Sequence, residues 1–227
     1  MSLILHYHPL SSCCHKTLIA LYELGVEFEP RLLNLGDPAQ RNDFMALWPT
    51  GKMPLLQDGF RVVPETSIII EYLVQRYAPS QALIPPDVED ALEVRLLDRL
   101  SDLYLMTPMQ AIVGDRLRAE EDRDSCSVEK ARATLSMAYG LLDQKLIGRR
   151  WIAGDGFSMA DCAVAPALFF ASTLVPIPDE CQLLSAYFDR LMERPSVARM
   201  LDEARPFFEF YPYREAIPAR FLNQTEA

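Results

Sequence analysis

The opening stretch of the chain, residues 1–33, changes from strand to helix spacing and back within a short span. Residues 3–7 form a brief apolar run, residues 12–24 have helical spacing and stop before Gly25, and residues 27–33 are typical of an extended segment. A strand, a helix and a second strand in this order make a βαβ unit with parallel strands, whose faces helices normally cover. This unit commits the start of the chain to an α/β fold.

A second helix and a hairpin are predicted after the βαβ unit. The helix has Pro38 in its first turn, a position that suits proline because the N–H it lacks has no helical partner there. Strands are expected at 53–57 and 61–64, because Asp58-Gly59 between them is a strong hairpin turn signal.

A third helix is expected in the segment that follows the hairpin. Thr66 and Ser67 are good N-terminal caps, and the helical pattern continues to residue 77. Residues 1–78 therefore have the predicted order β-α-β-α-β-β-α of a compact α/β domain. Residues 79–87 are rich in proline and are interpreted as a linker.

The strand signal disappears beyond this linker. Apolar side chains recur at helical spacing in two long runs, the first at Leu92, Leu96, Leu100 and Leu103, and the second at Leu135, Ala138, Leu142 and Leu146. This spacing predicts two long amphipathic helices. Residues 88–227 are therefore expected to form an all-α helical bundle domain.

One segment of the C-terminal part has the form of a helix start. Ser158 can cap a helix, Asp161 lies three residues later, where a capping box usually has Glu or Gln, and Phe157 precedes both as a hydrophobic staple. The residues that follow, 162–170, are apolar on all sides. This pattern predicts a helix buried at the centre of the bundle.

Charge and composition argue against several classes of partner. The chain has 32 acidic and 22 basic residues, a formal charge of -10, and no run of Lys and Arg, so neither nucleic acid nor an anionic membrane surface is expected to bind. No signal-peptide pattern is present, and no run reaches the roughly 18 apolar residues of a membrane span. Five cysteines without a disulfide pattern indicate a reducing compartment, and a cytoplasmic location is predicted.

Four local motifs occur along the chain. They are Ser11-Ser12-Cys13-Cys14-His15-Lys16 at the first strand-to-helix turn, Gly51-Lys52-Met53-Pro54-Leu55-Leu56 before the hairpin, Pro64-Glu65-Thr66-Ser67-Ile68 at the third helix, and the 157–161 helix start followed by Ala163-Val164-Ala165-Pro166. With these motifs the chain resembles, over nearly its whole length, the cytosolic glutathione transferase superfamily, and in particular its serine-type, theta- or zeta-like bacterial members. The resemblance implies a thioredoxin-like α/β N-terminal domain followed by the all-α bundle.

The resemblance also implies how glutathione binds as co-substrate. It implies a cis peptide bond at Met53-Pro54, where the backbone before the proline pairs with the cysteinyl portion of glutathione. At the γ-glutamyl end, a zwitterion, Glu65 meets the ammonium, and Thr66 with the helix N-terminus meets the carboxylate. Lys52 and Gln40 occupy positions from which relatives often reach the glycyl carboxylate.

The thiol-activating group is expected in the first motif, because hydrogen-bond donors at a helix N-terminus favour a thiolate over a thiol. Ser11 matches the first serine of the zeta-type motif and is the first choice, with Ser12 second, although serine before a helix is most often a cap. Cys13 is either a reactive thiol, with its pKa lowered by the helix dipole, or an inert and half-buried side chain. Cys14 is expected to face the core.

The predicted function is that of a glutathione transferase-type enzyme, a homodimer as in relatives, that activates the glutathione thiolate for attack on a small apolar electrophile. Three other glutathione-dependent reactions stay open. They are isomerisation of a maleyl-type diacid, for which Arg205 and Arg214 are candidate cations, reductive dehalogenation, and disulfide reduction through Cys13. An alternative of another class is a non-catalytic binding module with the same fold.

Two groups of residues have competing interpretations. Soft metal ligands crowd the N-terminus, but their spacing matches no familiar metal motif, and no metal is expected. The aromatic tail at 205–213, together with Tyr104, Met106 and Met109, belongs either to the core or to a pocket for the second substrate. The core is the prediction for most of them.

Overall fold

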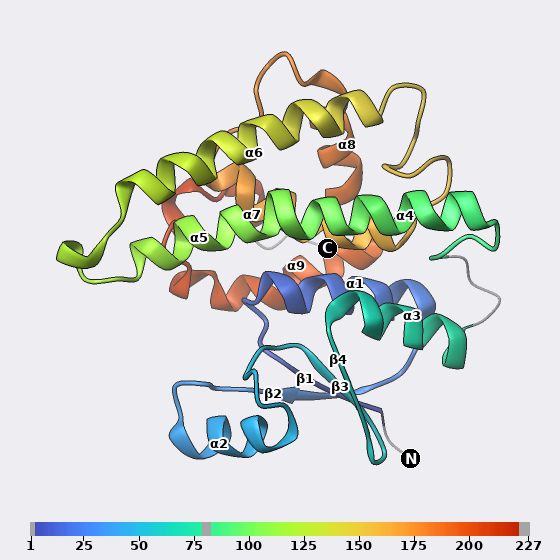
Figure 1. The fold of residues 1–227 in the computed structure, drawn as a ribbon, viewed down its shortest axis with the longest axis vertical. Helices are drawn as coiled ribbons and strands as arrows, with labels where there is room; N and C mark the ends of the chain where they lie inside the picture. The colour runs from blue at the N-terminus through green and yellow to red at the C-terminus, as the bar shows by residue number, and fades with distance from the viewer. Residues whose placement is uncertain (1–2, 79–82, 223–227) are drawn as a thin grey trace.

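The computed structural model describes residues 3–78 and 83–222, so the predicted linker lies partly outside the described residues. The α/β part contains, in chain order, β1 (Leu3–Tyr7), α1 (Ser12–Leu24), β2 (Glu29–Leu32), α2 (Pro38–Leu47), β3 (Leu55–Asp58), β4 (Arg61–Pro64) and α3 (Thr66–Tyr77). The predicted order β-α-β-α-β-β-α is confirmed (Figure 1).

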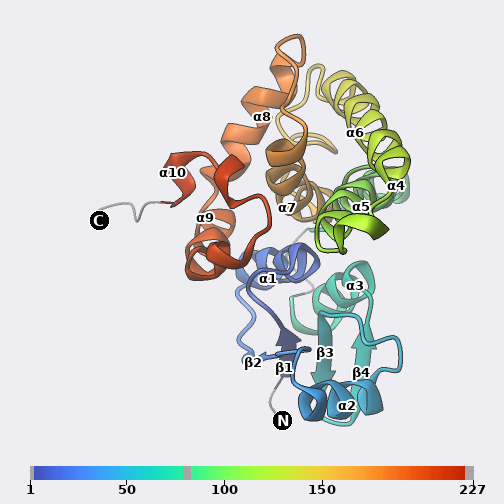
Figure 2. The same cartoon turned by 90° about the vertical axis from the view of Figure 1, so that its left-hand side faces the viewer.

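The four strands form one mixed sheet in the order β2-β1-β3-β4. β2 is parallel to β1, as the βαβ unit predicts, while β3 is antiparallel to β1 and β4 is antiparallel to β3. α1 and α3 lie between the sheet and the helical domain, and α2 lies on the other face (Figures 1 and 2). Phe44 of α2 packs there against Leu33 and Leu55 in a small second core.

The hairpin between β3 and β4 lies one residue later than predicted. Asp58 pairs with Arg61, so the two-residue loop is Gly59-Phe60 rather than Asp58-Gly59. Gly59 has a φ of 59°, which glycine adopts without steric cost. β3 also begins at Leu55 rather than at residue 53, since Pro54 has no N–H to donate to the ladder.

The remaining described elements are helical. α4 (Val88–Ser101) continues through the π-helical segment η1 (Asp102–Met106) into α5 (Thr107–Arg116). They are followed by η2 (Glu120–Asp122), α6 (Ser125–Lys145), α7 (Met159–Leu174), α8 (Gln182–Met192), α9 (Pro195–Ala204), η3 (Arg205–Phe210), η4 (Arg214–Ala216) and α10 (Ala219–Leu222). The prediction of a thioredoxin-like α/β domain followed by an all-α domain is confirmed.

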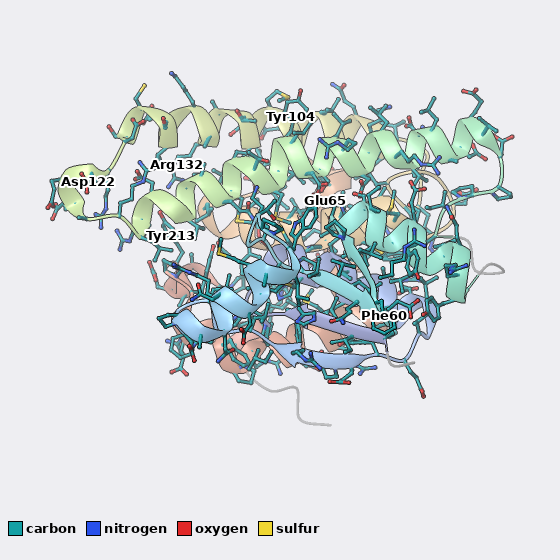
Figure 3. The ribbon with its side chains drawn as sticks, turned by 60° about the horizontal axis from the view of Figure 1, so that its bottom comes forward. Phe60, Glu65, Tyr104, Asp122, Arg132 and Tyr213 are labelled. Atoms are coloured by element: carbon teal, nitrogen blue, oxygen red, sulfur yellow. The ribbon has the colours of Figure 1, made fainter. Side chains whose placement is uncertain are left out.

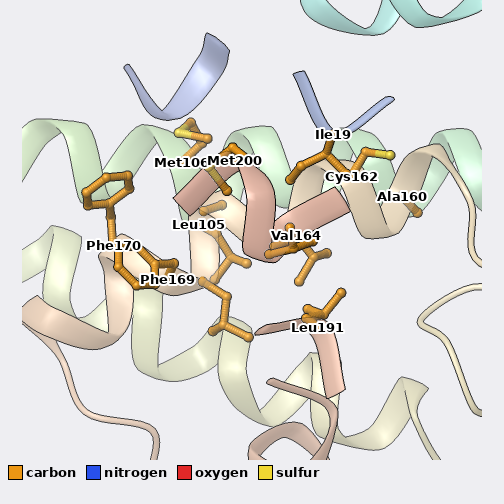
Figure 4. Packing of buried hydrophobic residues seen from close by; sticks show 14 of the residues in the cluster. Ile19, Leu105, Met106, Ala160, Cys162, Val164, Phe169, Phe170, Leu191 and Met200 are labelled. Atoms are coloured by element: carbon orange, nitrogen blue, oxygen red, sulfur yellow. The ribbon is translucent and has the colours of Figure 1, made fainter. Parts of the chain in front are cut away.

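α7 is the buried centre of the helical domain, as its all-round apolar sequence predicts (Figure 2). Figure 4 shows Val164 and Phe169 of α7 in one apolar cluster with Ile19 of α1, Leu105 of η1 and Leu191 of α8. The cluster includes residues of both domains, so the two domains share one hydrophobic core.

The start of α7 has the predicted capping box. Asp161 Oδ2 accepts hydrogen bonds from the Ser158 N–H (2.8 Å) and the Ser158 hydroxyl (3.0 Å). Asp161 Oδ1 accepts from the Ile152 N–H (3.0 Å) and the Tyr187 hydroxyl (2.7 Å). Asp161 therefore fixes the helix start and also joins it to the preceding loop and to α8.

The two predicted amphipathic helices differ in which side is covered. The second run of apolar residues, at 135–146 on α6, is buried as expected. The first is not, because Leu92, Leu96 and Leu103 are 59%, 46% and 47% exposed, while the neighbouring Ala91, Val94 and Leu97 face the core. α4 is thus apolar on two faces, one of which is uncovered in the single chain.

α1 is enclosed by α3, α7 and α9, and most of its residues are buried, including Lys16. Lys16 Nζ lies 2.7 Å from Asp98 Oδ1 and 3.1 Å from Asp102 Oδ2, and it donates to Ser67 Oγ (3.0 Å). Ser67 donates in turn to Asp98 Oδ2 (2.6 Å). This buried charge cluster joins α1 and α3 to α4 and η1 across the domain boundary.

η1 brings Asp102 into this cluster at an irregular point of the long helix. Pro108 has no N–H to donate to the preceding turn, which disfavours a regular α-helix here. The Asp102 carbonyl oxygen accepts the Thr107 N–H in this wider turn and also accepts a hydrogen bond from Thr107 Oγ1 (2.8 Å). Such wider turns are frequent at functional sites.

We predict that Lys16→Met lowers the free energy of unfolding by about 3–5 kcal/mol near neutral pH, because it leaves the buried Asp98 carboxylate without its cation and removes one cation from the half-buried Asp102. Burial already raises the pKa of Asp102, and Lys16 opposes that shift. Without Lys16 the folded-state pKa rises further above the unfolded value, so the folded state takes up protons as the pH falls. The decrease in unfolding free energy caused by Lys16→Met is therefore expected to become smaller as the pH falls from neutral to about 5.

Urea denaturation at the two pH values measures this effect. Lys145→Met is the matched control, since Lys145 pairs with Glu93 at a partly exposed site and its loss should cost about 1 kcal/mol or less. Equal losses for the two variants, or no pH dependence for Lys16→Met, contradict the prediction.

Candidate functional site

The turn between β1 and α1 is held in place by three hydrogen bonds. The Ser11 N–H donates to the His8 carbonyl oxygen (3.0 Å), the Leu10 N–H donates to His8 Nδ1 (3.1 Å), and His15 Nε2 donates to the Pro9 carbonyl oxygen. Burial lowers the pKa of His15 to about 4, so its ring is neutral and carries its hydrogen on Nε2, because a carbonyl oxygen only accepts. The start of α1 is therefore presented by a rigid turn.

Ser11 is the N-cap of α1, and its Oγ accepts a hydrogen bond from the Cys14 N–H (3.4 Å). A hydroxyl that accepts can still donate its own hydrogen. The cap role and the thiol-activating role, which the sequence left as alternatives, are therefore compatible in Ser11. Ser12 is the first residue of α1 and is buried.

A cavity of about 530 Å³ opens beside this turn, at the boundary between the two domains. We call it the polar cavity. Its walls include the predicted residues Ser11, Cys13, Lys52, Met53, Pro54, Glu65 and Thr66, and on the helical side Arg99, Asp102, Leu103, Met106, Thr107 and Gln110. The structure thus brings together all of the predicted site residues except Ser12 and Gln40.

The wall of the polar cavity at α3 begins with an unusual backbone. Glu65 has a φ of 67° and a ψ of 122°, a conformation that is strained for any residue except glycine and that clusters at functional sites. Glu65 is the N-cap of α3, and its side chain makes no capping hydrogen bond. Thr66 and Ser67 are the first two residues of the helix and are therefore not the caps we predicted. Figure 3 shows Glu65 at the start of α3, next to the long helix of α4, η1 and α5, and far from Phe60 at the hairpin tip.

Two of the implied binding residues differ in their placement. The Met53-Pro54 peptide bond is cis, as the resemblance implies. Gln40, in contrast, lies away from the polar cavity, because its Oε1 accepts from the Asn34 N–H (3.1 Å) and its Nε2 donates to Asp37 Oδ2 (3.2 Å). The Gln40 side chain supports the start of α2 instead.

Cys13 lies in the wall of the polar cavity, where its Sγ accepts a hydrogen bond from Gln110 Nε2 (3.3 Å). Burial raises the pKa of Cys13, although Gln110 opposes the shift. This direction is opposite to that of a thiol activated by a helix dipole. Cys14 is fully buried, as predicted, and burial raises its pKa to about 12.

A second cavity of about 320 Å³ lies next to the polar cavity, and we call it the apolar cavity. Its walls are mainly hydrophobic, and no charged side chain occurs among the described residues that line it. The polar side chains are Ser11, Ser12 and Gln110, and the other lining residues are Leu10, Met109, Val113, Gly114, Leu117, Phe170, Phe210, Tyr211 and Pro212. Ser11 and Gln110 line both cavities.

The lining of the two cavities bears on the residues for which the sequence left a choice between the core and a pocket. Met106, Met109, Phe208 and Tyr211 are all buried members of the main core, as expected. Met109 and Tyr211 also line the apolar cavity, and Met106 also lines the polar one. Tyr104 is partly exposed and lines neither cavity. The tail therefore contributes to both the core and the pocket.

Several residues that line the polar cavity were not found from the sequence, and three of them carry polar or charged groups that bear on its chemistry. Arg99, Asp102 and Gln110 lie on the long helix of α4, η1 and α5, more than 80 residues after the motif at the start of α1. The one signal for Gln110 is that it is a polar residue beside Met106, Met109 and Val113 at helical spacing. No local pattern links any of the three to Ser11.

Another cavity, of about 590 Å³, lies elsewhere, between α1, β2 and α9. Its walls include Tyr7, Tyr22 and Phe28, and the Tyr22 hydroxyl donates to Glu203, which also pairs with Arg199. None of the predicted site residues lines it. We therefore place the candidate site at the polar cavity, where the motif residues converge.

Within residues 3–78 and 83–222, no group of three or more His, Cys, Asp or Glu side chains is placed to hold a metal ion. His6 is bonded to Gln57 (3.2 Å), and His8 packs edge-on against Phe207. In the same ranges no helix has both the length and the apolar character needed to cross a membrane.

Similar proteins are known for both parts of the chain. The glutathione S-transferase N-terminal domain family matches residues 5–81, and the glutathione S-transferase C-terminal domain family matches residues 100–195. Glutathione S-transferase D7 of Anopheles gambiae is 30% identical over 230 residues, which cover 100% of this chain and 94% of that protein. Glutathione S-transferase GstB of Escherichia coli (strain K12) is 25% identical over 193 residues, covering 82% of this chain and 91% of that protein.

Solved structures have the same fold. A glutathione S-transferase of Methylobacillus flagellatus with bound glutathione superposes with a TM-score of 0.77 at 26% identity, over 88% of this chain and 98% of that chain. The glutathione transferase URE2P8 of Phanerochaete chrysosporium, with oxidized glutathione, gives a TM-score of 0.81 at 19% identity, over 92% and 97% of the two chains. The chain belongs to the cytosolic glutathione transferase superfamily.

Proposed function

We propose that the protein is a glutathione transferase that activates the thiol of glutathione beside Ser11 and directs it at a small, uncharged, apolar electrophile. The observation that supports this most is that Ser11, at the N-terminus of α1, lines both the polar and the apolar cavity. A sulfur held there meets a hydroxyl and the first N–H groups of a helix, which have no intrahelical acceptor. The sulfur lone pair forms the C–S bond, and the leaving group departs with its bonding pair.

The walls of the polar cavity supply a group for each end of glutathione. We assign Glu65 to the α-ammonium, and Thr66 with the open N-terminus of α3 to the adjacent carboxylate, since the start of a helix favours an anion. The backbone of Met53, before the cis proline, is assigned to the cysteinyl portion. Lys52, exposed at the rim, is assigned to the glycyl carboxylate. The Methylobacillus flagellatus relative with bound glutathione supports this choice of ligand.

The lining of the apolar cavity favours conjugation of an uncharged electrophile over isomerisation of a diacid. An anionic diacid needs cations beside the thiol, and the candidate cations are elsewhere. Arg205 donates to Asp202 and to the Phe221 carbonyl oxygen, and Arg214 is exposed and lines neither cavity.

The non-catalytic alternative has less support than the enzymatic one. A module that only docks a partner has no need for Ser11, the cis proline at Pro54 and the strained Glu65 around one cavity.

All five cysteines are free thiols in the structure. We propose a cytoplasmic location on this ground, since a reducing compartment keeps them so.

Glu65→Gln and Ser11→Ala are predicted to affect opposite ends of bound glutathione. Glu65→Gln removes a charge-assisted hydrogen bond to the ammonium and is expected to weaken glutathione binding by about ten- to a hundredfold. Ser11→Ala is expected to leave the affinity within a few fold but to raise the pKa of the bound thiol by about one to two units. Calorimetry and the pH dependence of the conjugation rate measure the two effects.

Ser12→Ala is the matched control for Ser11→Ala. With a higher thiol pKa the Ser11→Ala enzyme loses rate near neutral pH and recovers it as the pH rises through the new pKa. Wild-type protein that fails to bind glutathione at millimolar concentration contradicts the proposed function. A pKa shift in Ser12→Ala instead of Ser11→Ala contradicts only the assignment of the hydroxyl.

The position of Cys13 makes disulfide reduction a second candidate, and the reactivity of this thiol tests it. Because burial raises the pKa of Cys13, alkylation of Cys13 by iodoacetamide near neutral pH is expected to be at least several-fold slower than that of the exposed Cys126, and to accelerate as the pH rises. Mass spectrometry of the labelled peptides, with Cys126→Ser to isolate Cys13, gives both rates. Faster labelling of Cys13 than of Cys126 near neutral pH supports the reductase alternative.

The uncovered apolar face of α4 supports the proposal that the protein is a homodimer. Leu92 and Leu96 lie on that face, Leu103 continues it on η1, and Ile68 is exposed on the neighbouring α3. We expect Leu96→Glu to sediment as a single 25.8-kDa chain, whereas wild-type protein sediments at twice that mass. Met137→Glu, at an equally exposed site on α6, is the control and is expected to remain dimeric. A monomeric wild type at micromolar concentration contradicts the proposal.

A further inference from the structure

Gln110 on α5 is the polar side chain that the helical domain presents to both cavities. Among the described residues, Gln110 and Ser11 are the two that line the polar and the apolar cavity together. Ser11 belongs to the α/β domain and Gln110 to the helical domain. The boundary between the two cavities therefore has one hydrogen-bonding side chain on each wall.

The Gln110 carboxamide already donates to sulfur in this structure. Its Nε2 donates to Cys13 Sγ at 3.3 Å. A carboxamide nitrogen carries two hydrogens, so the bond to Cys13 uses one and leaves the other for a second acceptor. The contact places that donor beside Cys13, in the lining of the polar cavity that also includes Ser11.

The surroundings of Gln110 make a neutral donor effective. Gln110 is exposed in the single chain, but the apolar cavity that it lines also includes Met109, Val113 and Phe170. Glutathione and an apolar electrophile bound there would exclude water from its carboxamide and so strengthen a hydrogen bond to a charge. The charged or titratable groups that face the polar cavity are Cys13, Lys52, Glu65, Arg99 and Asp102, and none of these lines the apolar cavity. A thiolate at the boundary therefore has few charged groups on its electrophile-facing side.

We infer that Gln110 is a second catalytic donor, which gives its free amide N–H to the glutathione sulfur while Ser11 donates from the opposite wall. This inference rests on the proposed function. The thiol proton leaves to bulk water, and the negative charge on sulfur is shared between the serine hydroxyl and the carboxamide N–H. Gln110 thus raises the fraction of thiolate at neutral pH and holds the sulfur at the entrance to the apolar cavity.

The pKa of bound glutathione in Gln110 variants tests this inference. Ultraviolet difference titration of the glutathione complex against the S-methylglutathione complex reports the bound thiolate and cancels the cysteines of the protein. Gln110→Met, which removes the donor, is expected to raise the bound thiol pKa by about one unit and to lower the rate near neutral pH about tenfold. Gln110→Glu is expected to raise the pKa further, because a carboxylate repels the thiolate.

Gln144→Glu, the same change at an exposed position on α6, is the matched control and is expected to leave the pKa at the wild-type value. Affinity for S-methylglutathione, which has no ionisable thiol, is expected to be unchanged in both Gln110 variants. An unchanged thiol pKa in Gln110→Met and Gln110→Glu overturns the inference. A parallel loss of S-methylglutathione binding also overturns it, since it assigns Gln110 to the shape of the cavity. Wild-type protein that binds neither compound refutes the proposed function itself.

Discussion

The fold depends on the complete enclosure of α1 between the two domains. Its apolar side chains pack on the sheet, on α3 and on α7, and its buried Lys16 is held by Asp98, Asp102 and Ser67. Because α1 runs along the seam between the domains, its N-terminus opens where they meet. Ser11 is therefore placed where residues of the α/β domain and of the helical domain line the same two cavities. The site is a consequence of how α1 is buried.

The parts of this arrangement that the sequence predicted have local causes. The βαβ unit and the capping box of Ser158 and Asp161 each depend on residues close together in the chain. The cis bond at Met53-Pro54, which the structure contains, was implied by the family resemblance and not by the local sequence. The burial of residues 162–170 was predictable because this helix is apolar on every side, so it must be covered whichever elements surround it. The start of α1 and the start of α3, each marked by a local motif, line one cavity in the structure.

The parts that were missed depend on contacts between distant segments or on which face is covered. Cys13 and Gln110 are 97 positions apart, and Lys16 and Asp102 are 86 apart, so no spacing rule connects them. Periodicity predicted that α4 is amphipathic but not that Leu92 and Leu96 lie on its uncovered side. Gln40 was placed by analogy, and its hydrogen bonds to the start of α2 keep it away from the polar cavity.

A crystal structure of the protein with bound glutathione tests the central claim most directly, namely that the sulfur lies at the shared boundary of the two cavities. The account predicts that the sulfur is within hydrogen-bond distance of Ser11 Oγ and Gln110 Nε2, with the γ-glutamyl end at Glu65 and Thr66. A sulfur that contacts neither Ser11 nor Gln110, or glutathione bound outside the polar cavity, would contradict the account.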